Sequence, residues 1–198
     1  SSIEECHAAV RGASVTGLPI VLTLSIETNG RTMMGITPSD LVQLQDDLCT
    51  PLAAYGTNCG LGAAEVIAGI INMKQAADLA NVKPILVAKG NCGIPEWIDG
   101  KICYSGTPEL MAIYTKMAID SGARIIGGCC GTSPKHVAEM RKVIDSHEKG
   151  DTPDLARIES ELGVITSGAK AQMGGDLTIA GGAAGPGHKA SGRSRRRR

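Results

Sequence analysis

The stretch ARIIGGCCGTSPKHVAEMRKV, residues 123–143, passes from apolar residues through two glycines and two adjacent cysteines into a helical pattern. The continuous apolar run at 123–128 is typical of a buried parallel strand, and Ser133 with Pro134 forms a helix start. We therefore expect a strand, a loop that carries the two cysteines, and then a helix. This order of elements is the unit from which parallel α/β sheets are built.

Three further apolar runs precede this one, and each ends in glycine or polar residues: 18–25, 51–58 and 83–90. Segments with helical spacing lie between the runs, at 39–48, 62–80 and 107–122. We expect Ser39, after Pro38, to cap the first of these helices. Four repeats of a strand and a helix predict an α/β fold whose parallel strands are joined by right-handed crossovers.

Composition and charge exclude some classes of function. The chain is 42% hydrophobic but only 2% aromatic, with no Phe, so its core must be aliphatic and stacking on nucleobases is disfavoured. Residues 1–170 hold 14 basic and 19 acidic residues, a net charge of −5, which argues against nucleic-acid binding by the folded part. No apolar run approaches the roughly 18 residues of a membrane span, so we expect no membrane association.

Seven cysteines are dispersed through a sequence that shows no secretory leader. An odd number of cysteines in this setting predicts a reducing, cytoplasmic location, where thiols act as ligands or nucleophiles rather than in disulfides. We interpret Cys6, Cys49 and Cys103 as ordinary small buried side chains. The remaining four cysteines all follow the ends of predicted strands: Cys59, Cys92, Cys129 and Cys130.

The carboxyl ends of parallel strands are where α/β folds place their chemistry. Adjacent cysteines rarely form a disulfide with each other, because the geometry is strained, but both can bind one metal ion. With Cys59 they supply three thiolates and leave a fourth tetrahedral position open, as in a catalytic zinc site. The spacing alone would not reveal this set, because 70 residues separate Cys59 from Cys129.

The motifs GTNCG (56–60) and RIIGGCCGTSPKHV (124–137) resemble the paired zinc-ligand motifs of the homocysteine S-methyltransferase family. The resemblance extends over roughly residues 1–165, with the motifs in the right order at strand ends. It implies a (β/α)8 TIM barrel of which about the last four βα units are present here. It also implies that Cys59, Cys129 and Cys130 are the zinc ligands.

This resemblance implies that residues 1–150 form the C-terminal half of a homocysteine-binding barrel. We expect a short helical extension at 151–166 and a disordered Gly/Ala/Arg-rich tail at 167–198, with its arginine run solvated. The chain is shorter than the about 250 residues of a complete barrel, and it opens on a helical segment at 1–13. We therefore expect a truncated piece that is poorly stable, oligomeric or inactive on its own.

The activity implied by the resemblance is zinc-dependent methyl transfer from a cationic donor, betaine, to the homocysteine thiolate, giving methionine. Homocysteine would be the fourth zinc ligand, and coordination would remove its thiol proton. The zinc motif does not distinguish betaine from S-methylmethionine or methyl-folate as the donor. A homo-oligomer is compatible with the sequence.

Three residues near the cysteines are candidates for substrate contacts: Asn58, Thr132 and Ser133. The backbone amides of Thr132 and Ser133 open a predicted helix toward a substrate carboxylate, and Asn58 adjoins a ligand. Their alternative roles are those of a turn residue and a helix cap. We expect His136 to be a surface residue of the helix.

Three other interpretations stay open. The first is a half-barrel that binds zinc or thiols without a donor site. The second is a redox protein in which Cys92 pairs with Cys59 or with the doublet. The third is an unrelated barrel enzyme that binds pterin or phosphate, but the sequence has no glycine-rich phosphate loop with a lysine at the required spacing.

Overall fold

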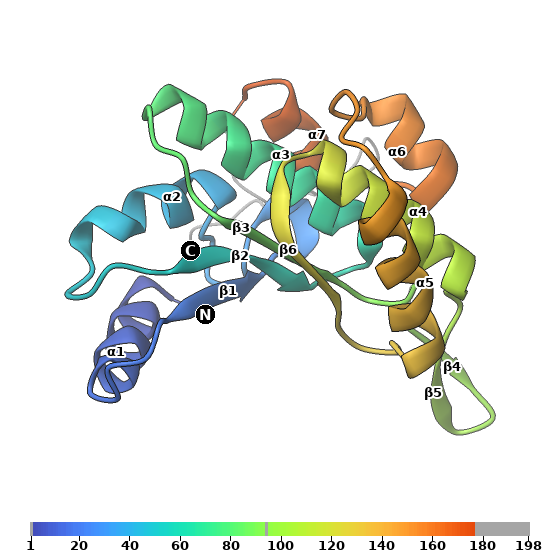
Figure 1. The fold of residues 1–198 in the computed structure, drawn as a ribbon, viewed down its shortest axis with the longest axis horizontal. Coiled ribbons are helices and arrows are strands. Elements are labelled where there is room, and N and C mark those ends of the chain that lie inside the picture. The colour runs from blue at the N-terminus through green and yellow to red at the C-terminus, as the bar shows by residue number, and fades with distance from the viewer. Residues whose placement is uncertain (1, 94, 177–198) are drawn as a thin grey trace, which may run out of the picture.

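A four-stranded parallel sheet organises this computed structural model, which describes residues 2–93 and 95–176 (Figure 1). Its strands are β1 (Val21–Ser25), β2 (Ala54–Cys59), β3 (Leu86–Gly90) and β6 (Ala123–Gly128). They lie side by side in the order β1-β2-β3-β6, and all neighbouring pairs are parallel. The four predicted apolar runs are confirmed as strands. Because the strands are parallel, their carboxyl ends all lie at the same end of the sheet.

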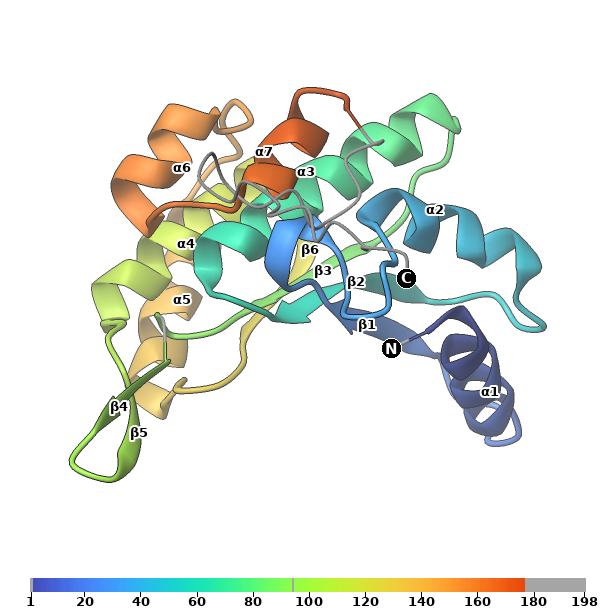
Figure 2. The same ribbon diagram turned by 180° about the vertical axis from the view of Figure 1, so that it is seen from behind.

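Four helices connect or follow these strands: α2 (Pro38–Asp47), α3 (Ala63–Leu79), α4 (Pro108–Asp120) and α5 (Pro134–Ser146). In Figures 1 and 2 α2, α3 and α4 cover one face of the sheet, and α3 lies at the centre of this layer. Helix α3 is buried over most of its length, and most of its buried residues are Ala, Val, Ile and Met. Burial of these aliphatic groups is the main force that holds the helix layer on the sheet.

Local capping signals explain where the helices begin. Helix α4 starts after Thr107, whose hydroxyl accepts a hydrogen bond from the Leu110 N–H. Helix α2 starts after Thr37, whose hydroxyl accepts from the Asp40 N–H while the Asp40 carboxylate accepts from the Thr37 N–H. The predicted cap at Ser39 is therefore wrong, because Thr37 before the proline forms a complete capping box.

An antiparallel hairpin of β4 (Pro95–Ile98) and β5 (Lys101–Tyr104) is inserted between β3 and α4. This hairpin was not predicted, although the Asp99-Gly100 pair at its tip is a strong hairpin signal. Both tip residues have positive φ, 48° and 76°. A short 3-10 turn, η1 (Thr28–Gly30), follows β1, and α1 (Ile3–Ser14) lies beside β1 at the sheet edge (Figures 1 and 2).

The C-terminal region differs from the prediction. Helix α6 (Leu155–Leu162) is confirmed, but a second helix, α7 (Ser167–Met173), occupies the start of the segment that we expected to be disordered from residue 167. Its glycine and alanine residues are what allow close packing, since a Cβ on Gly168 would lie 2.5 Å from the Asn29 carbonyl oxygen. The Gln172 side chain also donates to that carbonyl at 3.2 Å. The rest of the predicted tail, residues 177–198, lies outside the described residues.

The observed sheet is compatible with part of a barrel. It has four strands, and β1 and β6 are its two edges. An eight-stranded barrel is therefore still a prediction for this chain. Within residues 2–93 and 95–176, no helix has both the length and the apolar composition of a membrane span.

Candidate metal centre

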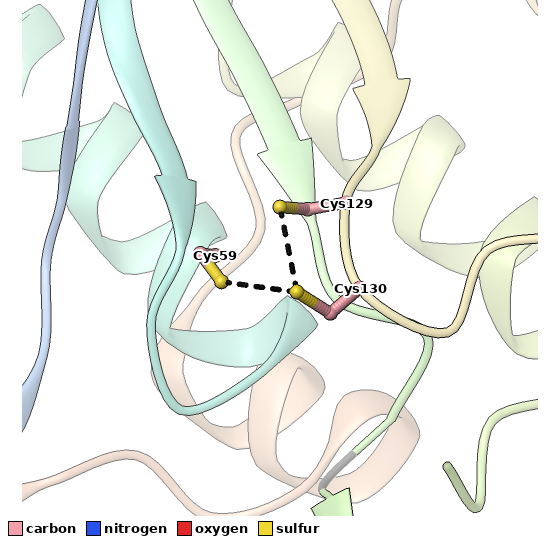
Figure 3. A group of neighbouring side chains, drawn as sticks. All are labelled: Cys59, Cys129 and Cys130. Carbon is pink, nitrogen blue, oxygen red and sulfur yellow. Dashed lines mark hydrogen bonds between the residues drawn. The ribbon is translucent and has the colours of Figure 1, made fainter.

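Strand β2 ends at Cys59 in an unusual backbone conformation. Cys59 has φ 58°, in the left-handed region that residues with a side chain rarely adopt. Gly60 follows with φ 66°, and a Cβ there would lie 2.0 Å from the Ile26 carbonyl oxygen, so only glycine fits. Such strain at a strand end is typical of a functional position, and here it turns the Cys59 sulfur toward the loop after β6 (Figure 3).

The cysteine doublet follows β6 and is held by backbone contacts with the loop after β3. The Cys129 N–H donates to the Gly90 carbonyl at 2.8 Å, and the Cys92 N–H donates to the Cys130 carbonyl at 2.9 Å. The Cys130 N–H donates to Oδ1 of Asn91 at 3.1 Å. These three hydrogen bonds fix the backbone of both cysteines, and so they define where the two side chains leave the chain.

Asn91 joins the two loops that carry the cysteines. Its side chain is buried, Oδ1 accepts from Cys130 as described, and Nδ2 donates to the Gly60 carbonyl at 3.0 Å. A single amide thus bridges the turn after Cys59 and the doublet. Asn91 was not among the residues predicted for the site, although it begins the second Asn-Cys-Gly string in the chain.

The three predicted ligand sulfurs converge (Figure 3). Sγ of Cys59 lies 3.6 Å from Sγ of Cys130, Sγ of Cys129 lies 4.0 Å from Sγ of Cys130, and all three fall within 4.8 Å of one another. Tetrahedral zinc with Zn–S bonds of about 2.3 Å separates two sulfurs by about 3.8 Å. The trio therefore fits a zinc ion with one coordination position left for another ligand.

The surroundings of Cys59 and Cys130 shift the pKa values of these two thiols in opposite directions. Burial, followed by the adjacent Cys130 and Cys129 side chains, raises the pKa of Cys59 to about 11. Hydrogen bonds from Cys59 and then from Tyr104, at the end of β5, lower the pKa of Cys130. A cation bound by the trio would stabilise all three thiolates together.

The residues predicted to contact substrate lie at the same end of the sheet. Nδ2 of Asn58 donates to the Ser25 hydroxyl at 3.2 Å, and Ser133 is the N-cap of α5. The Thr132 hydroxyl oxygen is buried and has no hydrogen-bond partner. Substrate contact by any of these three residues stays a prediction.

Cys92 and His136 form a second sulfur-containing contact. Cys92 is fully buried, and its sulfur lies 3.1 Å from Nε2 of His136. The Ser133 N–H donates to Nδ1 of that ring at 2.9 Å, which places the proton of the neutral imidazole on Nε2, where it points to the Cys92 sulfur. The prediction of a surface role for His136 is therefore wrong, because its ring is partly buried and has partners on both nitrogens.

All seven cysteines lie among the described residues, and each is a free thiol. Of the three that we interpreted as ordinary buried side chains, Cys6 is buried. The prediction is wrong for Cys49 and Cys103, which are exposed; Cys103 lies on β5 of the hairpin.

Comparisons with known proteins add independent information. A family model described as homocysteine S-methyltransferase matches residues 1–144, which include the three converging cysteines. Betaine–homocysteine S-methyltransferase 1 of Danio rerio is 28% identical over 171 residues, covering 78% of this chain and 41% of that protein. The chain thus spans about two fifths of the length of this relative.

Proposed function

This chain belongs to the homocysteine S-methyltransferase family, and from that membership we propose that it takes part in zinc-dependent transfer of a methyl group to the sulfur of homocysteine, giving methionine. One observation carries the proposal. Three thiols from the ends of β2 and β6 approach one another at distances that suit one tetrahedral zinc ion. An open fourth position is what a thiol substrate requires.

Cys59, Cys129 and Cys130 would hold the ion. Zinc bound there would lower the pKa of a substrate thiol and so supply a thiolate nucleophile at neutral pH. The chain's own residues provide the rigidity that this role requires, because Asn91 and the backbone amides of the doublet fix the loops. The N-terminus of α5, near Thr132 and Ser133, would favour the negative charge of a substrate carboxylate.

The proposed methyl donor is betaine. It is supported by the relative from Danio rerio, whose name includes betaine. S-methylmethionine and methyl-folate are the alternative donors. The substrates are small molecules in each case.

A second candidate is a zinc-binding portion without methyl transfer. The observation that favours it is the open sheet, with four strands and with β1 and β6 at its edges. A sheet that is not closed leaves unpaired backbone groups at both edges, and the ends of its four strands alone must then supply the loops for the metal, homocysteine and the donor.

The first experiment measures the zinc content of the purified, reduced chain. We expect about one zinc per chain, and none in a variant that carries both Cys129→Ser and Cys130→Ser, because one thiolate cannot hold the ion. Cys49→Ser is the matched control, since Cys49 is exposed and outside the trio. Absence of zinc from the unmodified chain would contradict the proposed metal centre.

The second experiment supplies homocysteine with betaine, S-methylmethionine or methyl-folate in separate reactions and measures methionine by mass spectrometry. Methionine formed with betaine supports the proposal as stated, and methionine formed only with another donor corrects the donor. Bound zinc without methionine from any donor supports the second candidate.

A further inference from the structure

A row of polar residues crosses the sheet one residue before the metal centre. The strand register aligns Ser25 with Asn58, Asn58 with Lys89, and Lys89 with Gly127. The next position along β2 is Cys59, aligned with Gly90 of β3, which in turn aligns with Gly128 of β6. The row therefore lies directly beside the strand ends that carry the converging thiols.

The side chains of this row lie on the face of the sheet that α2, α3 and α4 leave open. Residues alternate between the two faces of a strand. The preceding positions on the central strands, Thr57 and Ala88, are fully buried, and a Cβ on Gly69 of α3 would contact the Thr57 side chain. Asn58 and Lys89 must then point away from the helices, and both are only partly buried.

Contacts within the row support this orientation. The Asn58 amide donates to the Ser25 hydroxyl, so these two side chains lie on the same face. A Cβ on Gly127 would lie 3.7 Å from Cγ of Lys89, which places the lysine stem over the glycine. Because Gly127 has no side chain, the Lys89 stem has space beside it.

Lys89 is a partly buried cation close to the site, and within the described residues no ion pair involves it. An ammonium group that is partly removed from water gains from an anionic partner. Both substrates of the proposed reaction carry a carboxylate, and each must be oriented relative to the sulfur. The amine, the Ser25 hydroxyl and the Asn58 amide together form a polar surface that suits such a group.

We propose that Lys89, with Ser25 and Asn58 beside it, forms a carboxylate-binding subsite that orients a substrate against the three-cysteine centre. This inference rests on the proposed function and adds to it a recognition residue for the substrate. Either homocysteine or the methyl donor supplies the carboxylate, and the experiments below distinguish them.

The first test uses the chain loaded with Co²⁺. The three cysteine thiolates already give a sulfur-to-metal charge-transfer band, and a change in that band reports a further thiol entering the open position. Homocysteine is compared with 3-aminopropane-1-thiol, which is homocysteine without its carboxylate. If homocysteine supplies the carboxylate, Lys89→Met raises the Kd for homocysteine by roughly 10- to 100-fold. If the methyl donor supplies it, that Kd is unchanged, and the labelling test below must then show protection of Lys89 by betaine. The Kd for 3-aminopropane-1-thiol should stay within about twofold, and Lys89→Arg should restore part of the homocysteine affinity.

Lys116→Met is the matched control, because Lys116 lies exposed on α4. Its Kd for both thiols should equal that of the unmodified chain. The metal content and the far-UV circular dichroism of Lys89→Met should also be unchanged, since the row lies outside the ligand set. Equal loss of affinity for both thiols would mean that the lysine supports the fold and not the carboxylate, and would overturn the inference.

The second test does not depend on metal. An amine-reactive acylating reagent is applied to the chain, and labelling of Lys89 and Lys116 is followed by mass mapping. Protection of Lys89 alone by homocysteine assigns the subsite to the acceptor, and protection by betaine assigns it to the donor. Labelling of Lys89 that neither compound slows would overturn the inference. If Co²⁺ binds but homocysteine does not perturb its spectrum, the proposed function fails, and this labelling still decides the role of Lys89.

Discussion

Two loops of this protein carry the same three-residue string and use it differently. Asn58-Cys59-Gly60 ends β2, and Asn91-Cys92-Gly93 follows the adjacent strand β3. The register aligns Asn58 with Lys89, so the second string begins two residues later relative to the sheet. Cys59 is consequently the last residue of its strand and joins the sulfur trio, whereas Cys92 is fully buried against His136.

The two asparagines of these strings also have different hydrogen-bond partners. Asn58 lies in the strand and donates to the Ser25 hydroxyl of the neighbouring strand. Asn91 lies beyond its strand, where its side chain reaches both cysteine loops. The position of the string relative to the end of its strand, and not the string itself, decides the role of its asparagine. Asn91 bridges the two cysteine loops, whereas Asn58 lies on the face of the sheet.

The largest difference is expected when each of the two cysteines is replaced by alanine in turn. Cys59→Ala should weaken zinc binding by more than about 1000-fold, because two thiolates are left to hold the ion. Cys92→Ala should leave about one zinc per chain and lower stability by about 1 kcal/mol, since it removes a buried sulfur. Competition with a chromogenic chelator measures both affinities. If Cys92→Ala also lost its zinc, the second string would belong to the metal centre.

Substitution of the two asparagines should change zinc affinity by smaller factors than substitution of Cys59. Asn91→Ala removes hydrogen bonds to both cysteine loops, so we expect zinc affinity to fall about 10- to 100-fold and stability to fall by about 2 kcal/mol. Asn58→Ala should change zinc affinity less than about threefold. Urea unfolding of the metal-free variants separates the loss of stability from the loss of affinity. Equal effects of the two substitutions on zinc affinity would show that the bridge by Asn91 is not what fixes the doublet.

The smallest expected difference concerns the glutamates at the starts of the helices that follow these loops. Burial raises the pKa of Glu65 on α3, and hydrogen bonds with its own backbone and with Thr107 lower the pKa of Glu109 on α4. Above the ordinary pKa near 4.5, folded Glu65 binds more protons than the unfolded chain, so its contribution to stability falls as pH rises through its raised pKa. Glu109 has the opposite sign, and stability is lost as pH falls below its ordinary pKa.

We therefore expect Glu65→Gln to be about 1 kcal/mol more stable than the unmodified chain at pH 7, because a neutral amide avoids the cost of a buried charge. The amide oxygen can still accept from the Thr166 N–H. The advantage should shrink toward pH 5. Glu109→Gln should show no such gain at pH 7. Urea unfolding of all three proteins at both pH values measures the difference, and an advantage of Glu65→Gln that grows as pH falls would contradict the assigned sign.

The order of the four parallel strands and of the helices between them was predictable from the sequence, because continuous apolar runs and capping residues are local signals. The convergence of Cys59 with the cysteine doublet was predictable only through the resemblance of two motifs to a known family, since Cys59 and Cys129 are far apart in sequence. The bridging role of Asn91 was not predictable. Its partners lie 31 and 39 residues away in the chain. They are backbone groups, which every residue type has, so the sequence does not indicate them. Helix α7 was missed because composition describes its small residues as unstructured, whereas their close contact with η1 is what buries them.

The convergence of three sulfurs has a further consequence for the chain as a polymer. Cys59 leaves β2 and the doublet leaves β6, and these strands are not neighbours, because β3 lies between them. A cation that joins the sulfurs therefore closes a loop of about 70 residues and ties together strands that share no backbone hydrogen bonds. If the link persisted in the unfolded chain, closing such a loop would remove conformational entropy worth about 4 kcal/mol. The ion would then act as a reversible cross-link, and its supply would govern how firmly the outer strand β6 stays in the sheet.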